Sequence, residues 1–545
     1  MTSSDDDRHG PVSLRGIARR PMFAVAAVVL GSIFTNFDTR LTSYGLPDLR
    51  GAFSLSFDEG AWLYTASVGS QIFIAPAVAW LATAFGLRRV LAVPAILFAV
   101  VSYAIPFAKN YEVLMVLSTI HGLLLGTFVP ATFMIIFRNL PMQWWLWAIG
   151  IYAVRVGLTQ DVGLSAVGLF TAHLGWEWVY WQGVLVAPLM ALFVYLGTPP
   201  SPIDRDLLRN ADWGGMLLFG ASLSMFYAGL DQGNRLDWLG SGVVVGLLVG
   251  GGVLFIAFLV NEIYARHPWA NINVLFRRNI GLGLAVALFY TLTSLSNSAL
   301  VPSFLGTVTM LRSEQYGSLL LAYGALPILI LTPVSILVLR HVDARWVAAF
   351  GLSAFAAAGL LGMQLTHDWA PADFSTIVIL LSIGQVFTLT PTILTLVSNS
   401  DTSRATAFSA YIQIIRVGGA EIGVALMTTW LRVREQIHSN YLGLHIANGS
   451  SEVGHRLMAL TGHFLDRGSD VASARAVYVL SGSVAREANV LAFIDGFSLC
   501  FWLAVAGLFC VCWITRAPPG PFTPAPFGFA KAMLRRCGVS LAKQA

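Results

Sequence analysis

The first long apolar stretch of the chain, residues 22–47, reads MFAVAAVVLGSIFTNFDTRLTSYGLP. It is long enough to cross a bilayer as a helix. Asp38 lies within it, and a carboxylate in a spanning helix costs roughly 2.5–3.5 kcal/mol on insertion scales. Residues of this kind usually have a function. The stretch therefore predicts a membrane-spanning helix and makes Asp38 the first candidate functional residue.

Composition extends this interpretation to most of the chain. Of the 545 residues, 56% are hydrophobic and only 11% are charged, whereas a soluble protein carries about 25% charged residues. Lipid must therefore solvate most of the chain, which predicts an all-α membrane protein with fourteen transmembrane helices. The predicted spans are 22–46, 61–84, 91–108, 112–135, 147–172, 179–198, 213–230, 239–263, 281–306, 315–340, 347–366, 374–396, 406–431 and 491–515.

The distribution of basic residues predicts the orientation. An even number of spans puts both termini on one side, and Arg and Lys are enriched in cytoplasmic segments. Most short segments on the N-terminal side of the membrane are Arg-rich, for example Arg88, Arg89 and Arg138, and the C-terminal tail is basic too. We therefore expect both termini to be cytoplasmic.

Five motifs follow one another along the chain. The first, at residues 37–47, begins with FDT (37–39) and ends with GLP (45–47). The others are EGAWLYTAS at 59–67, WLATAFGLRR at 80–89, LDQGNRLDW at 230–238 and QIIRVGG at 413–419. Their order and spacing resemble the EmrB/QacA branch of the major facilitator superfamily, the fourteen-helix drug:proton antiporters.

The resemblance implies a domain organisation. The expected fold is the major facilitator fold, with two six-helix bundles that rock around a midplane site and two extra helices between them. The expected parts are a cytoplasmic N-terminal segment (1–21), the first bundle (22–198), a joint with the extra helices (199–263), the second bundle (264–515) and a cytoplasmic tail (516–545). Residues 432–490 are polar and should form an extracytoplasmic loop, either a helical hairpin capping the transporter or a docking surface.

The resemblance also implies a function. It is secondary active export of small amphipathic compounds, drugs or aromatic metabolites, by proton antiport in a bacterial inner membrane, without a cofactor. Such proteins often work with a periplasmic adaptor and an outer-membrane channel. The chain has no metal cluster, nucleophile motif or nucleotide loop, so an enzyme or an ATP-driven pump is not expected.

Several departures mark a divergent member. The gating loop keeps Gly86, Arg88 and Arg89, but Thr83 replaces its aspartate. The fourth-helix arginine of the family falls on Ser118, and the fifth-helix antiporter motif is degraded. A proton-coupled metabolite permease or importer on the same fold therefore remains the alternative.

Three intramembrane acids are candidates for proton coupling: Asp38, Asp161 and Glu421. A carboxylate among apolar helices can exchange protons near neutral pH. Arg40 is two residues from Asp38, a rotation of about 200° on a helix, so the two side chains should face opposite ways. If Asp38 faces the central cavity, Arg40 should reach a neighbouring helix or the membrane surface.

Other polar residues within the spans are candidates for the substrate cavity. They are Arg155, Arg416, Gln385, Gln413 and His121. A lone helix histidine is more often a hydrogen-bonding core residue, although it titrates in a useful range. Arg155 and Arg416 are the expected partners of Asp38. Because buried arginines and acids nearly balance, we expect neutral or weakly acidic aromatic substrates.

Overall fold

The computed structural model describes residues 21–140, 142–265, 277–399, 419–446, 450–464 and 469–516. All regular structure within these ranges is helical. The N-terminal half consists of α1 (Pro21–Tyr44), α2 (Leu46–Ala52), α3 (Phe57–Phe85), α4 (Leu87–Ala104), η2 (Ile105–Phe107), α5 (Tyr111–Leu125), α6 (Phe128–Asn139), α7 (Met142–Leu169), η3 (Phe170–Leu174) and α8 (Trp178–Gly197).

The joint and the C-terminal half follow. The joint holds α9 (Arg205–Arg209), α10 (Trp213–Gly233), η4 (Trp238–Gly240) and α11 (Gly242–Tyr264). The C-terminal half holds α12 (Arg278–Thr293), η6 (Ser296–Leu300), α13 (Val301–Thr307), α14 (Ser313–Leu319), η7 (Leu320–Ala325), α15 (Leu326–Leu339), α16 (Ala344–Gly362), η8 (Pro371–Phe374), α17 (Ser375–Ser398), α19 (Gly419–Leu444), α20 (Ser451–His463) and α21 (Ser469–Trp513).

The described helices match the predicted spans closely. Twelve of them are long and apolar enough to cross a membrane, and they coincide with twelve of the fourteen predicted spans. The other two positions belong to α7, which carries Arg155 and Asp161, and to α19. Residues 406–418 of the thirteenth predicted span lie outside the described residues.

Local sequence explains where α3 begins and ends. Ser56 and Glu59 form a capping box, in which the Glu59 N–H donates to Ser56 Oγ and the Ser56 N–H donates to the Glu59 carboxylate. The helix therefore begins at Phe57, four residues before the predicted span. Gly86 follows its last residue with φ +88°, a conformation that favours glycine.

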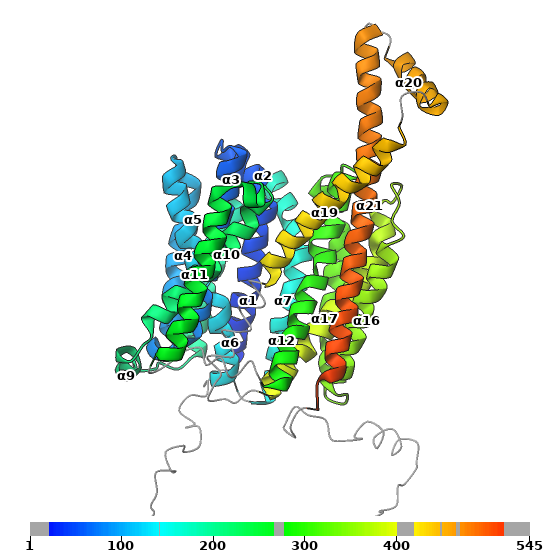
Figure 1. Ribbon diagram of the computed structural model, residues 1–545. Helices are drawn as coiled ribbons and strands as arrows, with labels where there is room; N and C mark the ends of the chain where they lie inside the picture. The colour runs from blue at the N-terminus through cyan, green and yellow to red at the C-terminus, as the bar shows by residue number, and fades with distance from the viewer. Residues whose placement is uncertain are drawn as a thin grey trace, which may run out of the picture.

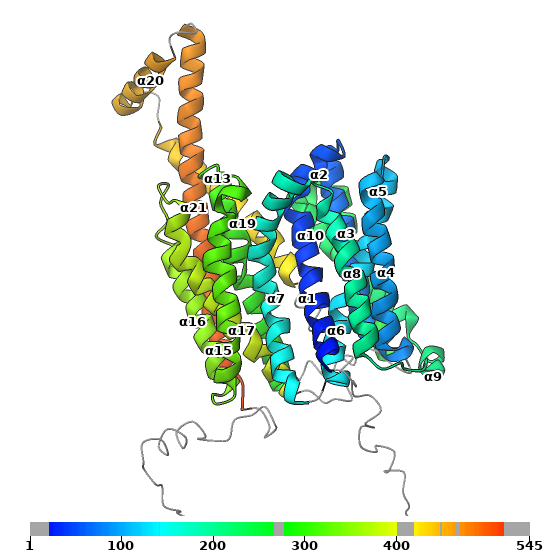
Figure 2. The same cartoon turned by 180° about the vertical axis from the view of Figure 1, so that it is seen from behind.

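The two halves stand side by side, with α1 beginning and α21 ending at the same face (Figure 1). We call this face the terminal face and the opposite one the distal face. The α10–α11 hairpin packs on α3 at the edge of the N-terminal half. Helix α7 packs against α1 of its own half and against α14, α15 and α17 of the other (Figure 2).

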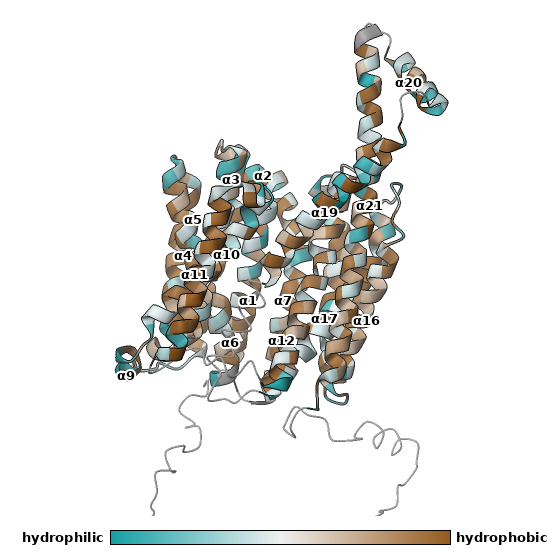
Figure 3. Cartoon of the chain, in the orientation of Figure 1, coloured by the Kyte–Doolittle hydropathy of each residue, from teal (hydrophilic) through white to brown (hydrophobic). Residues whose placement is uncertain are grey.

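The outer surface explains how the hairpin sits in lipid. Figure 3 shows brown, apolar residues along the outward faces of the spanning helices. On α11, Val249, Val253 and Ile256 are exposed, and a Cβ built on Gly246 would meet no atom within 4 Å. Apart from its contact with α10, this helix therefore presents an apolar face that lipid can cover.

The segment 432–490 is more helical than a loop. Helix α19 extends through it to Leu444, and α21 has 45 residues. At 1.5 Å per residue α21 is about 68 Å long, roughly twice the thickness of a bilayer core. Its first half rises far beyond the distal face with α20 beside its far end (Figure 1). We call α20 and the first half of α21 the arm, and it projects from the bundle (Figure 1).

Candidate functional site

Asp38 belongs to α1, and its side chain lies inside the N-terminal half, where it faces α5 and α8. The residue is 1% exposed. Gln182 Nε2 of α8 donates a 2.7 Å hydrogen bond to Asp38 Oδ1. His121 Nε2 of α5 lies 3.8 Å from Asp38 Oδ2. We call Asp38, His121 and Gln182 the acid cluster.

Aromatic rings enclose the acid cluster. The His121 ring packs on Phe98, with centroids 4.2 Å apart, and lies edge-on to Tyr180 at 5.8 Å. His121 is itself 2% exposed. The carboxylate and the imidazole therefore face each other in surroundings that exclude bulk water, where electrostatic interactions are strong.

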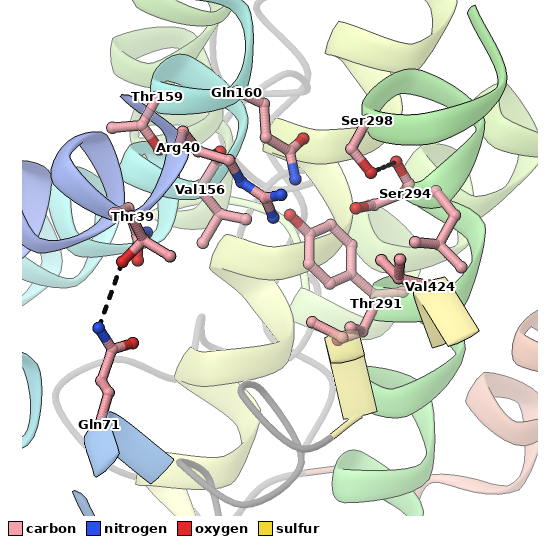
Figure 4. A pocket seen from close by; sticks show the side chains of 14 residues that line it. Thr39, Arg40, Gln71, Val156, Thr159, Gln160, Thr291, Ser294, Ser298 and Val424 are labelled. Atoms are coloured by element: carbon pink, nitrogen blue, oxygen red, sulfur yellow. Dashed lines mark hydrogen bonds between the residues drawn. The ribbon is translucent and has the colours of Figure 1, made fainter. Parts of the chain in front are cut away.

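A separate pocket lies between the two halves, on the other side of α1. Its described lining includes Arg40 and Thr39 of α1, Gln71 of α3 and Gln160 of α7. Figure 4 shows the Arg40 side chain reaching into this pocket toward Gln160. We call it the central pocket. It is lined mainly by hydroxyl and amide side chains, with Val156, Leu295, Ala420 and Val424 as the apolar members.

The structure thus reverses the expected roles of Asp38 and Arg40. The opposite orientation predicted from helix geometry is present, but Arg40 faces the central pocket and Asp38 faces the bundle interior. Arg155, one of the two expected charged partners of Asp38, makes no hydrogen bond to it, and Gln182 and His121 are beside the carboxylate in its place. Arg416, the other expected partner, lies outside the described residues.

A chain of hydrogen bonds crosses between the halves at the central pocket. Tyr290 of α12 donates from its hydroxyl to Gln385 Oε1 of α17 at 2.9 Å. Gln385 Nε2 in turn donates to Gln160 Oε1 of α7 at 3.3 Å. Tyr290 and Gln160 line the pocket. Gln385, which was predicted to line the cavity, lies directly behind these two residues and is hydrogen-bonded to both.

Asp161 is buried at the interface of the halves. Its side chain is 1% exposed, and a Cβ on Gly324 of η7 would overlap its carboxylate. Glycine is required there because the acid occupies the space of a side chain. Arg40 and Asp161 both lie close enough to Tyr44 to act on its phenol electrostatically. Asp161 and Arg40 therefore belong to one region at the interface of the halves, apart from Asp38.

Arg155 is fully buried in the N-terminal half, at 0% exposed. Its guanidinium lies over the Tyr152 ring, 3.8 Å from the centroid. None of its three guanidinium nitrogens has a hydrogen-bond partner in the described structure. Val156, the next residue in the sequence, lines the central pocket. Arg155 is not among the described lining residues.

Three sequence candidates cannot be placed. Arg416 and Gln413 lie outside the described residues. Glu421 belongs to α19, but its side chain is also outside the description. Its neighbour Ala420 lines the central pocket.

The gating loop lies at the terminal face. Arg88 stacks over the Tyr195 ring of α8 at 3.3 Å, and Arg89 Nη1 donates to the carbonyls of Phe85 and Ser201. Thr83, which replaces the family aspartate, accepts a 2.8 Å hydrogen bond from Arg138 Nη2. The loop is therefore held by stacking and neutral acceptors.

Gln182 and Tyr290 are two polar residues of these sites that were not among the predicted candidates. Gln182 lies in an otherwise apolar helix, and an amide in that position was a usable signal. Tyr290 gave no comparable signal, because tyrosines are common near membrane interfaces. Its place beside Gln385 depends on how α12 and α17 pack.

Comparison with known proteins identifies the family. The sequence model of the protein family described as the Major Facilitator Superfamily matches residues 28–423 of this chain. The chain belongs to the Major Facilitator Superfamily. It is a multi-pass membrane transporter and not an enzyme, and its helices make contact with a lipid bilayer.

Relatives of this superfamily member support the predicted branch. The multidrug export protein EmrB of Haemophilus influenzae is 23% identical over 91% of this chain and 95% of that protein. The EmrB protein of Escherichia coli K12 is 22% identical over 76% and 80%. The fatty acid resistance protein FarB of Neisseria gonorrhoeae is 20% identical over 75% and 80%. The chain is therefore a divergent relative of multidrug export proteins, as its motifs predicted.

Solved structures agree on the fold. A POT family transporter in complex with 5-aminolevulinic acid has a TM-score of 0.56, with 13% identity over 91% of this chain and 97% of that one. The proton:xylose symporter XylE has a TM-score of 0.53, with 12% identity over 91% and 96%. At these identities the likeness shows the major facilitator fold alone.

Proposed function

We propose that this superfamily member exports small amphipathic compounds across a bacterial inner membrane by proton antiport, with both termini in the cytoplasm. One observation carries the proposal. Asp38 is buried beside Gln182 and His121, while Thr39 and Arg40 of the same helix line the central pocket. The relatives named as multidrug export proteins support the direction of transport.

Helix α1 would couple the two sites. A buried carboxylate next to an imidazole can gain or lose a proton without leaving the bundle. Each change alters the charge between α1, α5 and α8, and thus the preferred packing of α1. Substrate acts on the opposite face of the same helix, so each ligand can favour a different orientation through differential affinity.

The lining of the central pocket suggests the chemistry of the substrate. Arg40 supplies a cation, and Thr39, Gln71 and Gln160 supply neutral hydrogen-bonding groups. Such a lining suits neutral or weakly acidic compounds that carry hydrogen-bond acceptors. Quaternary ammonium dyes should be poor substrates, because they have no acceptor for Arg40 and share its charge. Preferential transport of such dyes in a competition assay would contradict this choice.

The arm is the proposed contact for a periplasmic adaptor, which would lead to an outer-membrane channel. It extends beyond the distal face (Figure 1), and Val477 and Tyr478 on it are 55% and 79% exposed. The double substitution Val477→Ser/Tyr478→Ser should abolish co-purification of an adaptor but leave transport in liposomes intact. Unchanged co-purification would assign the contact to another surface.

The decisive experiment measures substrate-dependent proton flux in proteoliposomes over a compound panel. Asp38→Asn keeps an acceptor for Gln182 but cannot exchange a proton, so it should abolish pH-driven transport while leaving substrate binding within about twofold. Asp206→Asn, at an exposed acid of α9, is the matched control and should transport normally. Normal pH-driven transport by Asp38→Asn would remove Asp38 from the mechanism.

The direction of flux separates the proposal from its alternative. An exporter moves the compound against the proton flow, from the terminal to the distal side. A metabolite importer moves both in the same direction. Liposomes with a proton gradient of known sign, loaded or unloaded with the compound, distinguish the two.

A further inference from the structure

The motif LDQGNRLDW at 230–238 ends α10 and begins the turn to α11, and the transport mechanism above does not use it. Its central residue, Asn234, makes polar contacts with the other half of the protein. Asn234 Nδ2 donates to Thr428 Oγ1 of α19 at 3.0 Å. Thr429 Oγ1 donates to Asn234 Oδ1 at 3.1 Å.

A third bond from α19 reaches the backbone of the same residue. Arg432 Nη1 donates to the Asn234 carbonyl at 2.7 Å. Trp238 Nε1 also donates to Asn234 Oδ1, at 3.2 Å, which fixes the side-chain amide in this orientation. We call the three bonds between Asn234 and Thr428, Thr429 and Arg432 the clasp.

On its other side the motif is fastened to α3. Arg235 pairs with Asp58 and donates from Nε to Gln232 Oε1 at 2.6 Å. Thr65 of α3 donates to Asp231 and accepts from Gln232. The end of α10 therefore moves with α3 and the N-terminal half.

Helix α19 in turn belongs to the C-terminal half. Its Gly419 and Gly423 face Leu288 and Leu292 of α12. Arg434 Nε donates to Asp495 of α21 at 2.5 Å. The clasp thus joins two bodies that a rocking transporter must separate on one side.

The position of the clasp relative to the central pocket indicates what it controls. Gln71 of α3 and Val424 of α19 line the pocket. Thr65 lies six residues before Gln71, about 9 Å along α3, and Thr428 lies four residues after Val424, about 6 Å along α19. Both displacements lead toward the distal face. The motif, which is hydrogen-bonded to α3 and α19, therefore lies on the distal side of the central pocket.

From this geometry we propose that the α10–α11 hairpin is the distal gate of the transporter, and that the clasp must open for the central pocket to reach the distal side. The two helices beyond the pair of six-helix bundles thus have a mechanical role. Two of the three clasp bonds join neutral side chains and the third is donated by Arg432, so a few weak contacts hold the gate shut while leaving it able to open in each cycle.

The test cross-links the clasp in a chain with Ser at all four native cysteines. Asn234→Cys/Thr428→Cys, joined by a short bis(methanethiosulfonate) reagent that forms a disulfide with each cysteine and releases sulfinate, should lose at least tenfold in transport and recover it after reduction. Asn279→Cys/Asn399→Cys is the matched control. These residues also share a side-chain hydrogen bond, at 2.9 Å. They lie on α12 and directly after α17, in one half, so this cross-link should be harmless. Full transport by the cross-linked clasp pair overturns the proposal.

A second measurement does not depend on knowing the substrate. Spin labels distant from the clasp, one in each half at the distal face, should report in bilayers a short and a long distance population that change with pH. After Arg432→Gln the same pair of labels should show more of the open form, by on the order of tenfold in the open-to-closed ratio. A single short distance under all conditions overturns the gate. If labels move but no compound is transported, the proposed function fails and the gate stands.

Discussion

At the scale of single residues, Asp38 shows which groups of the described structure surround a buried carboxylate. The printed sequence suggests an arginine as its partner, whereas the described structure provides an amide and an imidazole. An amide donor satisfies one carboxylate oxygen in either protonation state. This arrangement is compatible with a carboxylate that changes its proton occupancy during the cycle.

The hydrogen bond between Gln182 and Asp38 can be tested by a double-mutant cycle. Gln182→Leu removes the donor and leaves a buried carboxylate oxygen without it, which should lower stability by about 1–3 kcal/mol. Asp38→Leu/Gln182→Leu removes both partners and should recover much of that loss. Thermal or denaturant unfolding of each variant in detergent gives the free energies of unfolding that the cycle compares. Purely additive losses would mean that the two residues are not coupled.

Arg155 poses the reverse problem, because its guanidinium has no hydrogen-bond partner in the described structure. Contact with the Tyr152 ring is worth roughly 2 kcal/mol when desolvated, less than the several kcal/mol that burying an ion costs. Arg155→Met should therefore raise the melting temperature in detergent. Loss of stability in Arg155→Met would mean that the cation is compensated in the fold after all.

At the scale of elements, close helix packing depends on a few glycines. A Cβ on Gly122 of α5 would overlap the Ser67 carbonyl of α3. The overlap is with backbone, which cannot move aside as a flexible side chain can. The position is next to His121, so this packing also sets the distance between α5 and the acid cluster.

Gly122→Ala should consequently cost stability, by about 1–3 kcal/mol or more for overpacking, and reduce the yield of folded protein. Gly246→Ala on α11 is the matched control. Its Cβ would meet nothing within 4 Å, so it should be neutral or slightly stabilising because alanine favours helix. Size-exclusion profiles and melting temperatures in one detergent compare the two. Equal behaviour would contradict the packing described for α3 and α5.

At the scale of the whole molecule, the proposed orientation assigns the arm to the periplasm and the terminal face to the cytoplasm. Tyr478 on the arm is 79% exposed, and Trp346 at the start of α16 is 69% exposed. In a cysteine-free background, an impermeant thiol reagent added to cells with a permeabilised outer membrane should label Tyr478→Cys and not Trp346→Cys. Labelling of Trp346→Cys alone would invert the topology.

The extent of correct prediction follows from how local each signal is. Apolar length is a local property, so the spans were placed within a few residues wherever the structure describes them. The predicted start of α3 was four residues too late, because a capping box of polar residues extends the helix beyond its apolar run. The length of α21 was underestimated for a similar reason, since a helix that continues into water has no apolar signal.

The sequence by itself determined that the chain is a helical membrane protein of this superfamily and that Asp38 and Arg40 point in opposite directions. Lipid forces backbone groups to pair within each span, and helix geometry fixes the angle between neighbours in sequence. Only the tertiary structure decided which of the two faces the central pocket, that Gln182 and His121 meet Asp38, and that Asn234 reaches α19. These contacts join residues distant in sequence, and they depend on how helices rotate and pack against one another.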